Sequence, residues 1–309
     1  MRYGEQVAAA LLLDALFGEP PEPVHPTVLM GRAISTFERA ALKLESPRSR
    51  RLAGIILAIS LPSLVFVSTR KLIDAVPVQL RWTLGTALIS TTISLRGLSE
   101  AARSVERELR DGRLECARVR VGHFVGRDTD DLPESEVCRA AVESVAENTS
   151  DGVVAPMIYG LLLGAPGALA YKAVNTLDSM VGYPQPPYTE IGWASARLDD
   201  VANLAPSRTT AFVTAAVSGR LLQTLRITRR YGSLTASPNA GRTEAAFAGA
   251  LGVRLGGTNA YGGVLREGRV LGDGRLPAPM DIQRAVRLMK RCCALLALLA
   301  VVVEMVRRG

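Results

Sequence analysis

The chain has 309 residues, a formal net charge of +8 and a mean hydropathy of +0.18, with 48% hydrophobic and 21% charged residues. This apolar content excludes an intrinsically disordered chain. Four cysteines without a CxxC pair and only two histidines argue against a disulfide scaffold and a Cys/His zinc motif. Aromatic residues make up only 5%, so platforms for base stacking are scarce and we expect no nucleic-acid partner.

Six apolar runs separate the charged stretches. In chain order they are Val7–Phe17, Leu52–Thr69, Trp82–Leu95, Val153–Tyr171, Thr209–Leu225 and Cys292–Val303. Val153–Tyr171 has 19 residues without a charge, which is long enough for a helix to cross about 30 Å of hydrocarbon. The runs predict an all-α, multipass integral membrane protein with a single membrane-embedded domain over 1–309. A soluble all-helical protein with buried core helices is the alternative, since the shorter runs fit either class.

The basic residues predict an orientation in the membrane. The loops 18–51, 96–152 and 226–291 hold 6, 9 and 12 basic residues, whereas 70–81 and 172–208 hold 3 each. Cytoplasmic loops carry the excess of lysine and arginine. We therefore expect a protein of the cell membrane whose first set of loops, and whose active site, face the cytoplasm.

Two stretches between the apolar runs are predicted to lie outside the membrane. The first is a helical insertion over about 96–151, in which Leu98, Ala102, Val105 and Leu109 recur at helical spacing and Asp111-Gly112 is a helix stop. The second is a polar, glycine-containing segment over about 226–290.

Local sequence signals give further detail on the secondary structure of the insertion. A second helix is expected to start near Pro133 with Asp131 as its N-cap. Strands are hardly signalled, apart from a weak alternation over Arg118–Val125.

An acidic cluster precedes the longest apolar run. Glu143 and Glu147 are four residues apart on one helix face, so they repel each other unless a cation or a proton lies between them. Asn148 and Asp151 follow at the helix end. Carboxylates and amides are the ligands that Mg²⁺ takes, although a solvated helix face followed by a turn explains the same pattern.

A second cluster follows that run. Lys172, Asn175 and Ser179 fall near one helix face with Asp178 close by, and the chain has only four lysines. Ionisable groups beside a membrane run are costly unless they are paired or line a polar cavity. Lys172 is therefore a candidate for a phosphate contact, with a lysine snorkelling to the interface as the alternative.

Further polar clusters come later in the chain. Arg197, Asp199, Asp200 and Asn203 could form a metal site or the capped start of a helix. Gly252–Gly263 is glycine-rich enough to approach a phosphate with backbone N–H groups. It is not a Walker A loop, because GxxxxGK[ST] does not occur in the chain. It is not a convincing dinucleotide fingerprint either, because no strand-like run precedes it.

These stretches, in this order, resemble the CobD/CbiB family of cobalamin biosynthesis. The matching stretches are Leu13–Asp14, Gly18–Gly31 with His25-Pro26, Val125–Thr129, Glu143–Pro156, Tyr171–Tyr183, Gly192–Asp200, Ser237–Gly241 and Gly256–Tyr261. The resemblance implies an adenosylcobinamide-phosphate synthase. Such an enzyme uses ATP to join (R)-1-amino-2-propanol, or its O-phosphate, to the free propionate carboxylate of adenosylcobyric acid. The corrinoid is then a substrate and not a prosthetic group.

Roles for individual residues follow as hypotheses from this resemblance. Mg²⁺ is expected at Glu147, Asn148 and Asp151. The expected catalytic residues are Glu143, Lys172, Asp199 and Asp200. Contacts to substrate or nucleotide are expected from His25, Asn175, Asp178, Arg197, Asn239, Gly256, Gly257, Asn259 and Tyr261. Membrane lipid is an expected partner. The sequence is also compatible with a homo-oligomer and with contacts to other enzymes of the pathway.

Two other classes remain open. A Mg²⁺-dependent membrane prenyltransferase would use Asn175-x-x-Asp178 and Asp199-Asp200-x-x-Asn203. A membrane transporter with broken helices is suggested by Gly164-Ala-Pro166-Gly167, but it should show an internal repeat and none is found.

A single membrane crossing by the longest apolar run disagrees with the positions of the family motifs. If Val153–Tyr171 crosses the membrane once, Glu147 and Lys172 lie on opposite faces, although both belong to the family motifs. Proline and glycine at Gly164–Gly167 break a helix. We therefore predict a re-entrant or sharply broken segment, with two short helices meeting near these residues.

Overall fold

A computed structural model describes residues 3–306 of the chain, except for the side chain of Val24. Helices dominate it, so the all-α prediction is confirmed. The chain divides into two compact units built from interleaved segments. Unit 1 comprises the segments up to Ser94, Ala155–Asn203 and from Ala297 onward, and unit 2 comprises Leu95–Val154 and Leu204–Leu296.

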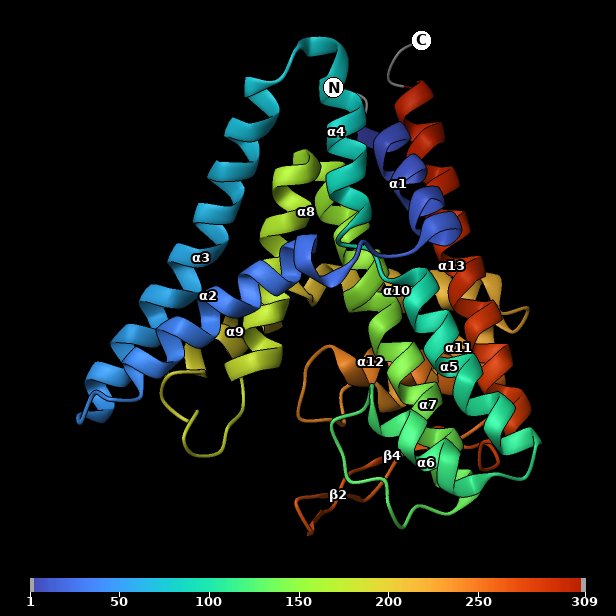
Figure 1. Cartoon of the computed structure of the whole chain (residues 1–309). Coiled ribbons are helices and arrows are strands. Elements are labelled where there is room, and N and C mark those ends of the chain that lie inside the picture. Colours follow the sequence, from blue (N-terminus) through green and yellow to red (C-terminus); the bar gives the residue numbers. More distant parts are fainter. Residues whose placement is uncertain (1–2, 307–309) are drawn as a thin grey trace. The chain divides into compact units, whose positions relative to one another are not determined.

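Unit 1 has a helical core. It contains α1 (Tyr3–Phe17), the 3₁₀ turn η1 (Glu22–Val24), α2 (Pro26–Ala41), α3 (Pro47–Ala75), α4 (Val78–Ser90), α8 (Ala155–Val181), α9 (Trp193–Ala202) and the last turns of α13 (Pro279–Val306) (Figure 1). Helices α2, α3 and α8 bury apolar side chains against one another, among them Ile34, Leu57 and Leu177. This packing holds the second half of α8 in place.

Helix α8 reverses its direction at Gly164. The backbone there has φ 69° and ψ −162°, which glycine adopts readily, and Pro166 follows two residues later. The rings of Tyr159 and Tyr171 stack with their centroids 5.0 Å apart, whereas twelve residues of straight helix would separate them by about 18 Å. The two halves of α8 therefore lie side by side (Figure 1), and the predicted sharp break is confirmed.

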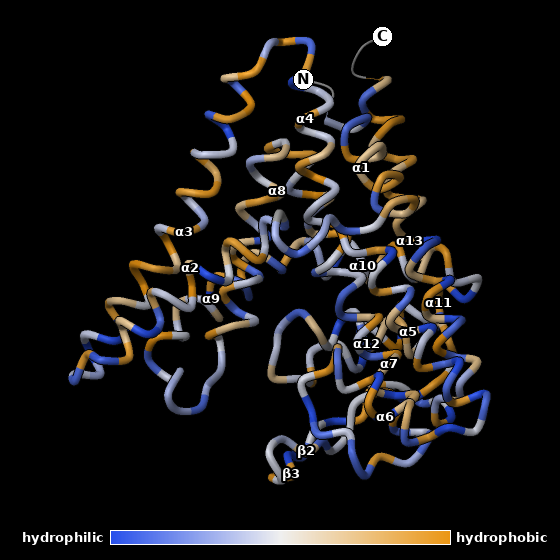
Figure 2. The backbone as a smooth tube through the Cα atoms, viewed as in Figure 1, coloured by the Kyte–Doolittle hydropathy of each residue, from blue (hydrophilic) through white to orange (hydrophobic). Residues whose placement is uncertain are grey.

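Two helical runs within residues 3–306 are long and apolar enough to cross a membrane. The first is α3, with 29 residues and only 28% of its most apolar window buried. Hydrophobic segments recur along it in Figure 2. Its exposed large apolar side chains are Leu52, Ile56, Ile59, Leu64, Val67 and Leu72.

The second run, Glu134–Val181, is 67% buried. It contains the reversal at Gly164, so the residues before and after this glycine do not form one straight helix. A straight crossing by Val153–Tyr171 is therefore wrong.

The expected spans elsewhere are less regular, and a multipass arrangement is not confirmed. Thr209–Leu225 is not one helix, because the chain leaves helical geometry at Ser218–Arg220, with Gly219 at φ 72°. Trp82–Leu95 is interrupted in the same way, since α4 ends at Ser90 and the next helix starts at Leu95. Small and polar residues interrupt both runs, an effect that counting apolar residues ignores.

Unit 2 is helical with short strands. Its helices are α5 (Leu95–Arg110), α6 (Leu114–Gly122), α7 (Glu134–Thr149), the π-helical turn η2 (Ser150–Val154), α10 (Leu204–Val217), α11 (Leu221–Tyr231), α12 (Ala240–Leu251) and the larger part of α13. The predicted stripe on α5 is buried, from Leu98 to Leu109, and the helix ends before Gly112, as expected. The predicted insertion lies within Leu95–Val154, while its place outside the membrane stays a prediction, as does a single domain over the whole chain.

One local expectation in unit 2 is wrong, and one weak strand signal falls on a helix. Helix α7 begins at Glu134 with Pro133 as its N-cap, so Asp131 does not cap it. Most of Arg118–Val125 lies in α6, because Ala117 and Val121 point into the core at helical spacing.

Four short strands form two antiparallel pairs within the described residues 3–306. Strand β1 (Leu255–Gly256) pairs with β4 (Val270–Leu271), and β2 (Asn259–Tyr261) pairs with β3 (Val264–Arg266). Gly262 and Gly263, at φ 58° and 77°, form the two-residue turn between β2 and β3, a position where both residues need positive φ. The glycine-rich segment is therefore mainly hairpin.

Candidate functional site

Unit 1 contains a buried carboxylate held by amide side chains. Asp199 on α9 accepts a hydrogen bond at Oδ2 from Asn203 Nδ2 at 2.9 Å, and Asn175 on α8 also donates to this carboxylate. The hydroxyl of Tyr171 donates to Asn203 Oδ1 at 2.8 Å, which orients the amide. We call these four residues the Asp199 cluster.

The carboxylate of Asp199 has a pKa closer to neutral pH than an ordinary aspartate. Burial raises the pKa of Asp199 to about 6, although the hydrogen bonds from Asn203 and Asn175 pull it down. Its second oxygen, Oδ1, is buried and has no hydrogen-bond partner within the described residues. A carboxylate with a free lone pair and a pKa near 6 is suited to accept a proton at neutral pH.

The residues beside Asp199 are more exposed. Arg197 has 69% of its side chain exposed and lies 3.4 Å from the carboxylate of Asp200. Asp178 lies beside Gly182, where an added Cβ would come within 2.0 Å of its Oδ1. Of the three predicted aspartates in this region, Asp199 is the one that the fold buries.

His25 and Lys172, far apart in the sequence, line one cavity of unit 1. It has a volume of about 280 Å³ and is lined by Glu19, Pro20, Glu22, His25, Thr27, Val28 and Lys172. We call it the His25–Lys172 cavity. It brings two predicted site residues together and adds two carboxylates that the sequence analysis did not single out.

The state of His25 follows from its neighbours. Its Nδ1 accepts a hydrogen bond from the backbone N–H of Thr27 at 3.2 Å. Its Nε2 is buried without a hydrogen-bond partner among the described residues and lies 3.8 Å from the carboxylate of Glu19. Burial lowers the pKa of His25, Glu19 opposes this and Lys172 adds to it. A neutral ring with Nδ1 as acceptor carries its proton on Nε2, so this buried N–H has no acceptor within the described residues.

Unit 2 buries another of the predicted site acids, Glu143, in a different environment. Its Oε1 accepts hydrogen bonds from Arg139 at 3.0 Å and from the backbone N–H of Gly256 at 2.6 Å. Its Oε2 binds Arg127. The side-chain oxygen of Asn259 accepts from both arginines, at 2.8 Å each. We call these five residues, with Glu136 paired to Arg139, the Glu143 network.

The Glu143 network supplies the positive charge that the Glu143/Glu147 spacing requires. Two arginines neutralise Glu143, so no metal ion is needed at this carboxylate. Glu143 has no free lone pair comparable to that of Asp199, and its geometry is that of a structural ion pair.

The predicted Mg²⁺ ligands lie at the end of α7. Glu147 is exposed, and Asp151 in η2 is partly buried. The amide N–H of Asn148 donates to the carbonyl of Ser144 at 2.9 Å. Within residues 3–306, no three Asp, Glu, His or Cys side chains come together as a metal site. Mg²⁺ at these residues stays a prediction.

A further carboxylate faces this region from α12. The pKa of Glu244 is held well above its usual range, chiefly by burial and then by the charges of Glu143 and Glu147. Sequence reasoning missed Glu244, since a single acid within an apolar helix carries no pattern. It also missed Arg139, although its spacing of three from Glu136 and four from Glu143 was a usable signal.

The glycine-rich segment uses its N–H groups within the chain. Besides Gly256, the N–H groups of Gly262 and Gly263 bind the carboxylate of Asp128 at 3.0 and 2.7 Å, which lowers the pKa of Asp128. Gly257 donates to the carbonyl of Arg269 at 3.1 Å. The N–H groups that would approach a phosphate are thus already bonded.

Two remaining predicted contacts lie in unit 2. The ring of Tyr261 is partly exposed beneath the guanidinium of Arg266, 5.3 Å from the ring centroid. Asn239 is buried and accepts a hydrogen bond from Ser207 Oγ at 3.1 Å. Neither contact indicates a ligand, and their roles stay predictions.

The chain is similar to proteins of cobalamin biosynthesis over nearly its whole length. The model of the CobD/Cbib protein family matches residues 7–289. Relatives named cobalamin biosynthesis protein CobD occur in Geobacter metallireducens (43% identity, 97% of this chain and 96% of the relative), Synechocystis sp. (42%, 88% and 82%) and Halalkalibacterium halodurans (41%, 92% and 91%). No solved structure shows significant similarity to the chain.

Proposed function

Since the chain belongs to the CobD/CbiB family and is an enzyme of cobalamin biosynthesis, we propose that it forms an amide between an amino alcohol and a corrinoid. The amine is (R)-1-amino-2-propanol or its O-phosphate. The acid is the free propionate carboxylate of adenosylcobyric acid, and ATP is the co-substrate.

The observation that carries this proposal is the state of Asp199. Amide formation requires a base, because the attacking nitrogen must lose a proton as the C–N bond forms. A buried carboxylate with one unbonded oxygen and a pKa of about 6 accepts such a proton at neutral pH. Asp200 is paired with the exposed Arg197 and is the weaker candidate.

The carboxylate of the corrinoid must be activated before the amine attacks. In the proposed sequence, this carboxylate attacks the γ-phosphate of ATP and ADP leaves. The amine then attacks the acyl phosphate and inorganic phosphate leaves with the C–O bonding electrons. Glu147, Asn148 and Asp151 would hold Mg²⁺, which binds through one or two carboxylates and substrate phosphates and neutralises phosphate charge.

The lining of the His25–Lys172 cavity suits the small amine substrate. Glu19 and Glu22 suit an ammonium group, and Lys172 with the Nε2 of His25 suits a phosphate or hydroxyl. A cavity of about 280 Å³ is large enough for an amino alcohol and far too small for a corrinoid. We therefore assign the amine to this cavity.

We also propose that the protein is embedded in the cell membrane in a multipass arrangement, with its active site facing the cytoplasm. The outward apolar side chains of α3 support this. Exposing such a stripe on a 29-residue helix to water is unfavourable, and large exposed apolar patches mark contacts with a protein or a membrane. The hairpin of α8 suits a re-entrant segment, whose non-helical turn must be covered by protein or line a cavity.

An amidation assay tests the function directly. Purified protein with adenosylcobyric acid, either amine, ATP and Mg²⁺ should release ADP and form the amide in equal amounts. Lys172→Met should lose activity, and Lys172→Arg should not restore it fully because a guanidinium places its charge differently. Formation of no amide with either amine would sink the proposal, and turnover of a prenyl diphosphate would favour a prenyltransferase.

Labelling tests the topology. Cysteine would replace the exposed Glu115 and Thr189 in turn, in a background without the native cysteines. The re-entrant arrangement predicts that an impermeant reagent modifies both positions from the same face. Labelling from opposite faces would refute it.

A further inference from the structure

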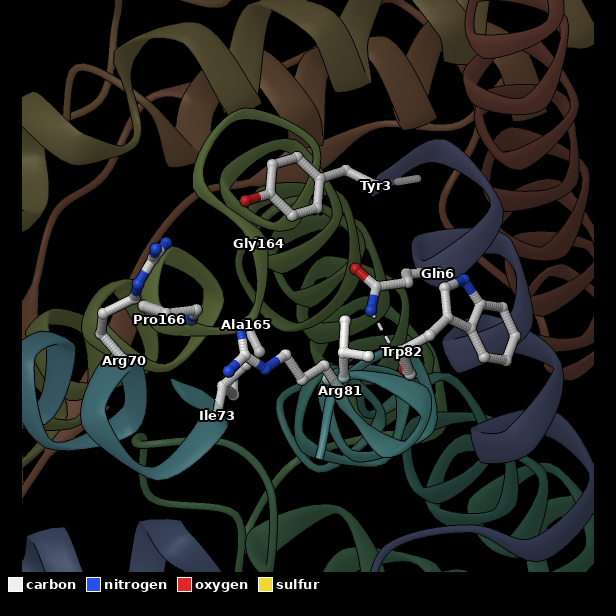
Figure 3. A pocket seen from close by; sticks show the side chains of 11 residues that line it. Tyr3, Gln6, Arg70, Ile73, Arg81, Trp82, Gly164, Ala165 and Pro166 are labelled. Carbon is white, nitrogen blue, oxygen red and sulfur yellow. Dashed lines mark hydrogen bonds between the residues drawn. The ribbon is translucent and has the colours of Figure 1, made fainter. Parts of the chain in front are cut away.

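An apolar cavity of unit 1 lies where α8 reverses. It has a volume of about 390 Å³, and its lining is drawn in Figure 3. The lining residues are Tyr3, Gln6, Arg70, Ile73, Val78, Arg81, Trp82, Gly85, Gly164, Ala165 and Pro166. None of the residues assigned above to the reaction is among them, so the cavity has no role in the proposed chemistry.

The walls come from four helices held close together. Gln6 of α1 donates to the carbonyl of Trp82 on α4 at 3.0 Å, the bond dashed in Figure 3. A Cβ at Gly85 would come within 2.6 Å of the Gln6 amide, and one at Gly164 within 2.7 Å of the Tyr3 ring. The cavity is therefore a built feature with close-packed walls.

The surface around the cavity is apolar. Leu72, Val78, Leu162 and Leu163 each leave 48–69% of the residue exposed. Hydrocarbon chains match these exposed apolar side chains.

Two guanidinium groups lie at this apolar cavity and share one carboxylate. Arg70 Nε lies 2.8 Å from Asp74 Oδ2, and Arg81 lies 3.7 Å from Asp74 Oδ1. Arg81 also donates to the backbone carbonyls of Asp74 and Val76, which fixes its position. The two arginines and the single carboxylate of Asp74 leave one positive charge in excess. Trp82 also lines the cavity, and tryptophan is favoured at membrane interfaces.

We propose that this cavity binds one anionic phospholipid, with an acyl chain in the apolar part and the phosphate at Arg70 and Arg81. The proposal rests on the proposed membrane embedding and is independent of the reaction. An acyl chain satisfies the walls, which a free phosphate does not, and the excess positive charge favours an anionic over a zwitterionic headgroup. Arg70 is the better placed of the two for hydrogen bonds to the phosphate, because its bond to Asp74 uses Nε and a guanidinium has further N–H groups to donate.

Retention of lipid tests the proposal. The full chain is purified in mild detergent from nanodiscs containing equal phosphatidylglycerol and phosphatidylcholine, and bound lipid is identified by native mass spectrometry. We expect one phosphatidylglycerol for each protein, in preference to phosphatidylcholine. Arg70→Gln should lower its occupancy about fivefold, as expected for one basic residue at a headgroup.

The control is a matched ion pair. Arg96 on α5 forms the same i,i+4 pair with Glu100, also at 2.8 Å, so Arg96→Gln should leave lipid retention unchanged. Ala165→Leu, which fills the cavity without changing charge, should remove both lipids.

Four outcomes overturn the proposal. They are equal retention of the two lipids by the wild-type protein, unchanged phosphatidylglycerol in Arg70→Gln, displacement of the lipid by glycerol 3-phosphate, and closure of the cavity by a second copy of the chain. The wild-type comparison needs no variant to fold. A protein recovered from the soluble fraction would overturn the membrane proposal together with this one, whereas an inactive protein that retains the lipid would overturn only the proposed reaction.

Discussion

Each unit buries one of the acidic residues predicted for the site, and the two carboxylates have opposite kinds of hydrogen-bond partner. In unit 2, Glu143 receives two arginines and a backbone N–H. In unit 1, Asp199 receives only amide donors and keeps one oxygen unbonded. The difference separates a carboxylate that holds the fold together from one that can exchange a proton. Glu143 is held by cationic partners, whereas burial beside neutral amides raises the pKa of Asp199.

The largest effect is expected from breaking the Glu143 network. Arg139→Gln removes one of the two cations at the buried Glu143 and the cation of the partly exposed Glu136, which should lower the free energy of unfolding by about 3–5 kcal/mol. Thermal unfolding in detergent measures this. Arg96→Gln, which breaks an exposed pair, should show no resolvable change, and equal effects of the two variants would show that the network is not structural.

Asp199→Asn should abolish most of the activity while leaving the fold intact. The amide keeps the shape of the side chain but cannot take a proton, so turnover should fall by about 100-fold or more. The KM for ATP should stay unchanged. Initial rates of amide formation report the loss, and a variant that retains near-normal turnover would remove Asp199 from the mechanism.

The pKa of Asp199 predicts a pH dependence. Only the ionised form accepts a proton, so activity should rise with pH through about 6, and a rate that is flat between pH 5 and 7 in the wild-type enzyme would contradict this.

Stability should change in the opposite direction. Because this pKa is raised from 3.8 to about 6, the native state holds the proton more strongly than the unfolded chain. The contribution is therefore fully present below pH 3.8 and is lost as pH rises through about 6. The loss should be about 2–3 kcal/mol, measured by chemical unfolding, and Asp199→Asn should abolish this dependence.

The smallest effect is expected from Tyr171→Phe. This change removes the hydroxyl that orients Asn203 and so loosens the Asp199 cluster without touching its carboxylate. One neutral hydrogen bond is worth about 1 kcal/mol, so turnover should fall by about fivefold. The acid limb of the pH profile should shift as well, and a lower turnover without this shift would point to a purely structural role for Tyr171.

Several features of this protein follow from its sequence alone. The buried stripe of α5, its end before Gly112 and the break of the long apolar run at Gly164 are all local. Each depends on residues within a few positions of one another, where helical periodicity and the backbone limits of glycine and proline act. The family is also carried by motifs that are contiguous in the chain.

The partners of the polar residues were decided only by the tertiary structure. The spacing of Glu143 and Glu147 shows that a positive charge is needed, but not that Arg127 and Arg139 supply it. In the same way, nothing local predicts that Asn175 donates to Asp199 or that Lys172 shares a cavity with His25. From the sequence alone, any hydrogen-bond donor or cation along the chain could be the partner of a given carboxylate. The packing of distant helices decides which of these groups comes close enough to bind it.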